Sequence, residues 1–264
     1  MQRLLAYLID RLIIKHPVFR RFVTRLLEGD KNFDLQLLGT QLRVHSVEEH
    51  GYLRAYRISR TNSLFRDELP VLINLAGILR DGDTFVDVGA NVGMYCLTLA
   101  RFKQIYPNIC IYAFEANAGT YSRLSENARR LGVIAHHIAL SDHDGQLQFV
   151  SGAVSHVFTT VANCSNYSIT GERTLVPCKR LDEFNISGDS IVMKIDVEGQ
   201  EKEVLEGAER LFRDGRIRAV YLDGYKDRSI EGLLLGYGFR LLEGRTLQPA
   251  AGHVFSLLAV RSDR

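Results

Sequence analysis

Short apolar runs alternate with helix-forming stretches from about residue 83 onward, and this alternation limits the possible folds more than any other feature. We expect strands at residues 84–88, 110–114, 133–140, 146–150, 191–195, 217–222, 239–242 and 254–260. Parallel neighbouring strands need crossover helices, and those helices cover both faces of the sheet. The sequence therefore predicts an α/β domain with a mostly parallel sheet, closed by an antiparallel edge strand from the last two runs.

The segment before the alternating region has weaker signals. Residues 33–60 alternate loosely between apolar and polar, which predicts two or three antiparallel strands, and a helix should follow over residues 66–79. We expect an N-terminal helical segment and small β appendage over 1–65, and the main domain over 66–264. The region after about residue 200 should form one helix that extends to residue 213.

Residues 1–28 carry apolar side chains at helical spacing, interrupted at Pro17 and mixed with basic residues. Two interpretations stay open: a cap packed on the domain or on a second subunit, or a helix on the surface of a membrane. Asp10 and Arg11 interrupt the first apolar run, which is unlike a signal peptide, and no run reaches the ~20 residues of a membrane span. The four cysteines lack disulfide or zinc spacing. We expect a cytoplasmic protein, with peripheral membrane contact through this segment as the alternative.

A glycine-rich turn follows the first strand of the alternating region, where Asp87, Gly89, Asn91 and Gly93 form the pattern D-x-G-x-N-x-G. Glycines at such a strand-to-helix turn let the backbone approach a ligand closely. A pyrophosphate favours the pattern G-x-G-x-x-G at a helix N-terminus. A ligand with an ammonium and a carboxylate, such as a methionine moiety, suits a turn that carries an acid and an amide.

The next two strand ends also carry polar groups. Glu115, followed by Ala116 and Asn117, stands where an acid accepts hydrogen bonds from ribose hydroxyls, and the alternative is a solvated or helix-capping glutamate. Ser141 and Asp142 could bind an adenine edge or form an ordinary turn. The carboxyl ends of parallel strands meet at one edge of a sheet, so these groups should form one nucleoside cleft.

Lys194, Asp196 and Glu198 surround the end of the strand at 191–195 and are the candidate catalytic residues. Asp196 would orient or deprotonate an acceptor hydroxyl, whereas Glu198 would hold the substrate or the next helix. Two alternatives stay open. Lys194 and its acidic neighbours could be a structural ion pair, or Asp196, Glu198 and Asp223 could bind Mg²⁺, although their spacing is not diagnostic of a metal site.

Residues 151–173 are rich in Ser, Thr, Asn and Gly, and we interpret them as an irregular loop that faces the substrate. His156 in this loop is a further candidate base. His136 and His137 lie within an apolar strand, which favours packing or surface roles.

Four motifs together resemble the FkbM family of methyltransferases: Asp87–Gly93, Phe114-Glu115, Ala139–Asp142 and Met193–Glu201. The resemblance covers residues 67–225. It implies a Rossmann-like class I methyltransferase fold, S-adenosylmethionine as the methyl donor, and usually a hydroxyl acceptor on a carbohydrate, lipid-linked or secondary-metabolite molecule. It also implies a cofactor pocket lined by Asp87, Gly89, Asn91, Gly93, Glu115 and Asp142.

The sequence departs from the family pattern in two places. Asp223 stands where the family often has a Glu followed by a His, which puts a shared substrate role at that strand in doubt. Ala116 replaces a frequent Pro.

The sequence leaves two alternative functions open. An NAD-linked oxidoreductase would share the turn and the ribose contact, but the chain lacks G-x-G-x-x-G and a Tyr-x-x-x-Lys pair. A methyltransferase fold could also serve as an inactive binding module. The net charge of +2 and the missing aromatic Asn-Pro-Pro-Tyr-type motif disfavour nucleic acid as a partner.

Overall fold

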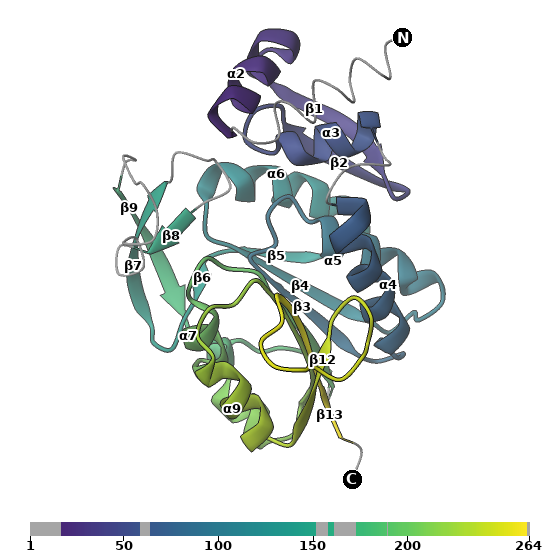
Figure 1. Cartoon of the computed structure of the whole chain (residues 1–264), viewed down its shortest axis with the longest axis vertical. Helices are drawn as coiled ribbons and strands as arrows, with labels where there is room; N and C mark the ends of the chain where they lie inside the picture. The colour runs from purple at the N-terminus through teal and green to yellow at the C-terminus, as the bar shows by residue number, and fades with distance from the viewer. Residues whose placement is uncertain (1–16, 59–63, 152–157, 161–172, 189, 263–264) are drawn as a thin grey trace.

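The computed structural model describes residues 17–58, 64–151, 158–160, 173–188 and 190–262 (Figure 1). Predictions for residues 1–16 and for His156 and Cys164 lie outside these residues. Every cysteine that is described is unpaired, and Cys96 and Cys178 are buried, in keeping with their expected role as small core residues.

A seven-stranded sheet forms the centre of the molecule, in the order β12-β13-β11-β10-β3-β4-β5. Its strands are β3 (Thr84–Val88), β4 (Cys110–Glu115), β5 (Ile134–His137), β10 (Ile191–Ile195), β11 (Ile217–Asp223), β12 (Phe239–Glu243) and β13 (Ser256–Arg261). Only β13 is antiparallel to its neighbours, and it lies one position in from the edge strand β12. The α/β class and the mostly parallel sheet are confirmed.

Helices cover both faces of this sheet (Figure 1). They are α4 (Leu69–Ile78), α5 (Met94–Ala100), α6 (Ala118–Ala128), α7 (Glu201–Glu206), α8 (Glu209–Arg213) and α9 (Ser229–Gly236), with short 3₁₀ turns at Arg101–Gln104, Arg129–Leu131 and Leu181–Glu183. Alternate strand residues enter separate cores: Phe85 packs with α4 and α5, whereas Val86 packs with the α7–α9 side. This period of two is what a sheet buried on both faces requires.

The single helix expected from about residue 200 to 213 is divided into α7 and α8 at Gly207. A Cβ at Gly207 would lie 2.0 Å from the carbonyl oxygen of Ser141. The backbone of the Ser141 turn therefore passes directly against this position, which explains both the glycine and the interruption.

The N-terminal part contains α2 (Pro17–Glu28), the hairpin β1 (Asn32–Leu37) and β2 (Thr40–His45), α3 (His50–Ile58) and a π-helical turn (Leu64–Glu68). The expectation of strands throughout residues 33–60 is wrong for α3. Its residues Leu53 and Ala55 are buried against the hairpin, whose single apolar face needs a cover, and Leu, Arg and Ala are good helix formers.

The hairpin shares one hydrophobic cluster with the main domain, because Leu42 and Val44 pack in the same core as Leu97 and Leu124. Polar contacts reinforce this packing. The side chain of Asn127 on α6 accepts from the backbone N–H of residue 43 at 2.7 Å and donates to the carbonyl of the same residue at 3.1 Å. The hairpin is therefore held against α5 and α6.

A second, four-stranded sheet has the order β6-β9-β7-β8. Its strands are β6 (Ala139–Leu140), β7 (Gly145–Ser151), β8 (Phe158–Thr160) and β9 (Arg173–Lys179). The strand expected at 133–140 is thus two strands in different sheets, β5 and β6. The segment 151–173, expected to be irregular, contains β8. This strand pairs antiparallel with β7, and Thr160 stands opposite Phe149.

The helix α2 exposes large apolar side chains: Phe19, Phe22, Leu26 and Leu27 are 51–73% exposed. None of the helices in the described part of the chain is long and apolar enough to cross a bilayer. Contact of the N-terminal segment with a membrane or a second subunit stays a prediction.

Candidate functional site

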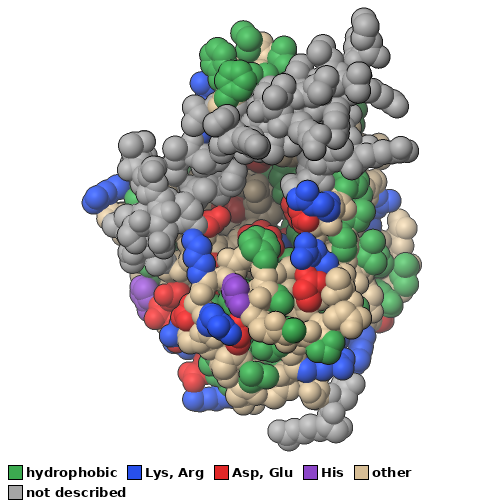
Figure 2. All heavy atoms as spheres, in the orientation of Figure 1, with side chains coloured by type: hydrophobic (Ala, Val, Ile, Leu, Met, Phe, Trp, Pro, Cys, Tyr) green, Lys and Arg blue, Asp and Glu red, His purple; other side chains and the backbone are tan. Residues whose placement is uncertain are grey.

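A cavity of about 310 Å³ opens at the carboxyl ends of β3, β4 and β10, where the topology of an open α/β sheet places ligands. Figure 2 shows acidic side chains around the hollow at the centre of this face. Of the residues expected at the site, the cavity wall includes Gly89, Asn91, Glu115, Ala116, Asn117, Lys194, Asp196 and Glu198.

The turn after β3 places backbone against the cavity. Gly89 has a φ of 72°, and a Cβ there would lie 2.0 Å from the carbonyl oxygen of Asp196, so only glycine lets the ends of β3 and β10 approach this closely. Asn91 also has a positive φ, 52°, and its side-chain oxygen accepts from the backbone N–H of Val92 at 2.8 Å. Gly93 is not in the wall; it makes room for Leu97 and the packing of α6.

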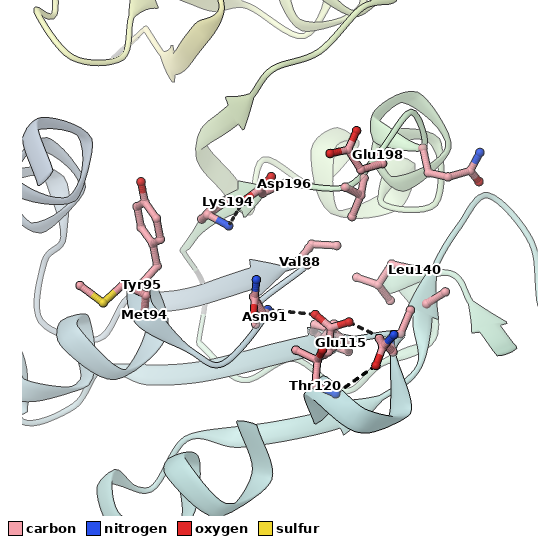
Figure 3. Close-up of a pocket in the computed structure, with 18 of the residues that line it drawn as sticks. Val88, Asn91, Met94, Tyr95, Glu115, Thr120, Leu140, Lys194, Asp196 and Glu198 are labelled. Carbon is pink, nitrogen blue, oxygen red and sulfur yellow. Dashed lines mark hydrogen bonds and ion pairs between the residues drawn. The ribbon is translucent and has the colours of Figure 1, made fainter. Parts of the chain in front are cut away.

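Glu115 joins two turns of the cavity wall. Its carboxylate accepts from the backbone N–H of Asn91 at 2.9 Å and of Asn117 at 2.8 Å (Figure 3). Burial raises the pKa of Glu115 to about 7, although these two hydrogen bonds act in the opposite direction. The side chain of Asn117 accepts from the N–H of Thr120 at 3.0 Å and so caps α6.

Asp87 is not a wall residue, contrary to the prediction. Its side chain is 0% exposed and lies behind the cavity, where one oxygen accepts from the N–H of Cys96 at 3.1 Å. The other oxygen is 3.3 Å from Nζ of Lys194. The reason is register: Asp87 and Lys194 are direct neighbours on the parallel strands β3 and β10. Asp87 therefore acts on the cavity through Lys194.

Lys194 links the buried layer to the cavity. Its Nζ is 3.2 Å from Asp196, whose side chain is 47% exposed, and 4.8 Å from the centre of the Tyr95 ring (Figure 3). Although burial lowers the pKa of Lys194, the carboxylates of Asp196 and Asp87 outweigh it and raise that pKa above its usual value. The ion pair that the sequence left open as an alternative for Lys194 is present, and Asp196 is the member that solvent and ligands can reach.

Glu198 lies on the same side of the cavity as Asp196, across from Glu115 (Figure 3). Its carbonyl oxygen accepts from the Thr159 hydroxyl at 2.7 Å, so the second sheet fixes this part of the wall. Among the residues that the structure describes, no group of three or more His, Cys, Asp or Glu is placed to hold a metal ion, and Asp196, Glu198 and Asp223 do not assemble as the Mg²⁺ alternative requires.

The third strand end contributes differently from the prediction. Ile138, Ala139 and Leu140 form the wall, whereas Ser141 and Asp142 do not. The Asp142 carboxylate accepts from Ser141 at 3.1 Å and pairs with His143 at 2.6 Å. The chain turns away after β6 because Ser141 pairs by its N–H with the end of β9. Apolar side chains therefore replace the expected polar pair.

The two neighbouring histidines of β5 have packing roles, as expected. The ring of His136 stacks on Phe114 with centroids 5.0 Å apart, and that of His137 stacks on Tyr121 at 4.9 Å. Neither lines the cavity.

Four wall residues come from the N-terminal part and were not predicted: Glu48, Glu49, Tyr52 and Glu68. Arg123 on α6 binds both Glu48 and Glu49, which attaches the turn after β2 to the main domain. No local pattern marks these acids as site residues, since only the packing of the hairpin on α6 brings them to the cavity.

Glu68 ends the π-helical turn and lines the cavity. Burial raises the pKa of Glu68 to about 7, and the nearby carboxylates of Asp196 and Asp223 act in the same direction. The backbone oxygen of Glu68 accepts from the Tyr95 hydroxyl at 3.4 Å.

Comparisons with known proteins place this site in a family context. A family model described as the methyltransferase FkbM domain matches residues 87–241. Hexuronic acid methyltransferase AglP of Haloferax volcanii is 29% identical over 175 residues, which cover 61% of this chain and 66% of that protein, just under two thirds of its length.

Two solved structures are also similar. Methyltransferase FkbM from Methylobacillus flagellatus has 15% sequence identity and a TM-score of 0.46, with 80% of this chain and 53% of that chain covered. A TehB-like SAM-dependent methyltransferase from Corynebacterium glutamicum has 12% identity and a TM-score of 0.43, with 82% and 99% covered.

Proposed function

Because this chain belongs to the FkbM methyltransferase family, we propose that it binds S-adenosylmethionine in the cavity and transfers the methyl group to a hydroxyl of a carbohydrate-type acceptor. The observation that carries the proposal is the joint position of Glu115 and Asp196, which face one cavity from opposite sides.

The wall around Glu115 fits a nucleoside and an amino-acid group. The Glu115 carboxylate has lone pairs left beyond its two backbone contacts, so it can accept from ribose hydroxyls. Ile138 and Leu140 offer an apolar surface for a base. Gly89 lines the cavity, where a polar ligand end can approach its backbone. S-adenosylmethionine would supply a methyl group on a sulfonium, which leaves as a neutral thioether.

Asp196 is suited to the acceptor. Its exposed carboxylate accepts the hydrogen bond of an acceptor hydroxyl, orients one oxygen lone pair toward the methyl carbon, and takes the proton as the new C–O bond forms. Lys194 forms an ion pair with this carboxylate at 3.2 Å, and Asp87 forms a second ion pair with Lys194. AglP is named for a hexuronic acid, which supports a sugar-type acceptor here.

Replacement of Asp196 by Asn tests this assignment. Asp196→Asn should bind S-adenosylhomocysteine within about twofold of the wild type, because Glu115 is unchanged, but lower methyl transfer by roughly 100-fold or more. Transfer is measured with methyl-labelled S-adenosylmethionine and a panel of glycosides.

Asp214→Asn is the matched control, because Asp214 is exposed just after α8 and is not part of the cavity wall. Full transfer by the Asp196 variant, on an acceptor that the wild type methylates, would contradict the role proposed for Asp196.

A further inference from the structure

Glu68 and Asp196 are linked by a chain of contacts through Tyr95 and Lys194. The Tyr95 hydroxyl donates to the backbone of Glu68 at 3.4 Å, and the ring of Tyr95 lies 4.8 Å from Nζ of Lys194, which binds Asp196. Both residues line the cavity, and Asp196 lies across it from Glu115 (Figure 3). The part of the cavity left for an acceptor is therefore bordered by two acids.

The Glu68 carboxylate is the acid without an assigned task. It is partly exposed in the cavity wall, and it makes no hydrogen bond or ion pair with any residue in the described part of the chain. Neither of its oxygens is both fully buried and unpaired, so the carboxylate is open to the cavity and can accept from donors that a ligand supplies. Its position on a π-helical turn agrees, because such turns are frequent at functional sites.

The charge of the wall limits which ligand can supply these donors. The described wall residues include six acids, namely Glu48, Glu49, Glu68, Glu115, Asp196 and Glu198, and one basic residue, Lys194. Arg123 offsets Glu48 and Glu49 from outside the wall, and Lys194 is shared between Asp87 and Asp196. The described part of the wall thus has an excess of negative charge once these carboxylates are ionised, above a pH of about 7. That excess favours a sulfonium-bearing donor and repels a carboxylate on the acceptor.

We propose that Glu68 is a substrate-binding residue that, together with Asp196, accepts hydrogen bonds from neighbouring hydroxyls of an uncharged acceptor and excludes acceptors that carry a carboxylate. This inference rests on the proposed function. It sets the chain apart from a relative named for a hexuronic acid. Above a pH of about 7, where Glu68 is ionised, the two carboxylates match a diol, which offers two donors, whereas a uronate would place a third negative charge between them.

The test uses the full chain loaded with S-adenosylhomocysteine and a panel of matched methyl hexosides and methyl hexuronides, with binding measured by calorimetry. The wild type should bind at least one neutral hexoside roughly 10-fold or more tightly than its uronide. Glu68→Gln should weaken binding of that hexoside by about 10-fold, the scale of a lost hydrogen bond to a charged group, and should reduce the preference over the uronide.

Glu183→Gln is the matched control, because Glu183 is exposed on the 3₁₀ turn before Phe184 and lies outside the wall. It should behave as the wild type, and both variants should keep their affinity for S-adenosylhomocysteine within about twofold, which also reports correct folding. Tighter binding of a uronide, absence of binding by every hexoside, or a Glu68 variant equal to the control would overturn the inference. A folded wild-type protein that does not bind S-adenosylhomocysteine would instead overturn the proposed function itself.

Discussion

Replacement of Asp87 by Asn should destabilise the fold far more than the same replacement of Asp196, although both carboxylates bind the same lysine. The Asp87 side chain is 0% exposed and lies 3.3 Å from Nζ of Lys194, which is itself 3% exposed. Two unit charges at that distance attract by about 5 kcal/mol at an effective dielectric constant of about 20. Removing one partner of a buried pair typically costs about 3–5 kcal/mol, and we expect the lower end because Lys194 keeps Asp196.

The pair with Asp196 is different, since that carboxylate is 47% exposed and water screens it. Exposed pairs contribute about 0–1 kcal/mol. A loss of about 3 kcal/mol corresponds to a melting temperature lower by roughly 6–12 °C, at about 2–4 °C per kcal/mol for a domain of this size. Thermal unfolding followed by circular dichroism measures both variants. Equal shifts for Asp87→Asn and Asp196→Asn, or a shift for Asp87→Asn below about 2 °C, would refute the distinction between a buried support and an exposed reactive group.

Two further predictions concern pH and packing. Burial raises the pKa of Glu68, Glu115 and Glu201 from 4.5 to about 7, so the folded protein without ligand keeps protons that the unfolded chain has lost. Its melting temperature should therefore fall as the pH rises from about 4.5 to 7, and Glu115→Gln should make this fall smaller; an identical fall in the variant would count against the buried carboxylate. Gly207→Ala should lower the melting temperature by several degrees, because its Cβ would lie 2.0 Å from a backbone oxygen, whereas Gly77→Ala in α4 has open space and should leave it equal or higher. Similar behaviour of the two alanine variants would disprove the close contact.

The central sheet could be predicted from the sequence because its strands are short apolar runs that end in polar residues. Thr84–Val88 and Ile191–Ile195 are each buried along their whole length. Their pattern gives no information on register, however. The pairing of Asp87 with Lys194 depends on which residues stand opposite in neighbouring strands, so the sequence could not predict this ion pair.

The parts that the sequence does not predict depend on contacts between distant segments. α3 alternates in burial much as a strand does, and only its packing on the hairpin shows that it is a helix. The small sheet escapes prediction because β9 buries just two of its seven residues, Val176 and Cys178. Glu68 lies in an ordinary-looking acidic stretch before Pro70, and its role follows only from the position of the π-helical turn beside Tyr95.

The most direct test of the account is a parallel calorimetric titration of the purified protein with S-adenosylhomocysteine, S-adenosylmethionine and NAD. We predict binding of the first two with dissociation constants in the micromolar range, which corresponds to about −8 kcal/mol, and no binding of NAD. The same titration of Gly89→Ala should show no binding, since a Cβ at that position would collide with the Asp196 backbone. A folded wild-type protein that binds neither sulfur compound would contradict the methyl-transfer function proposed for this cavity.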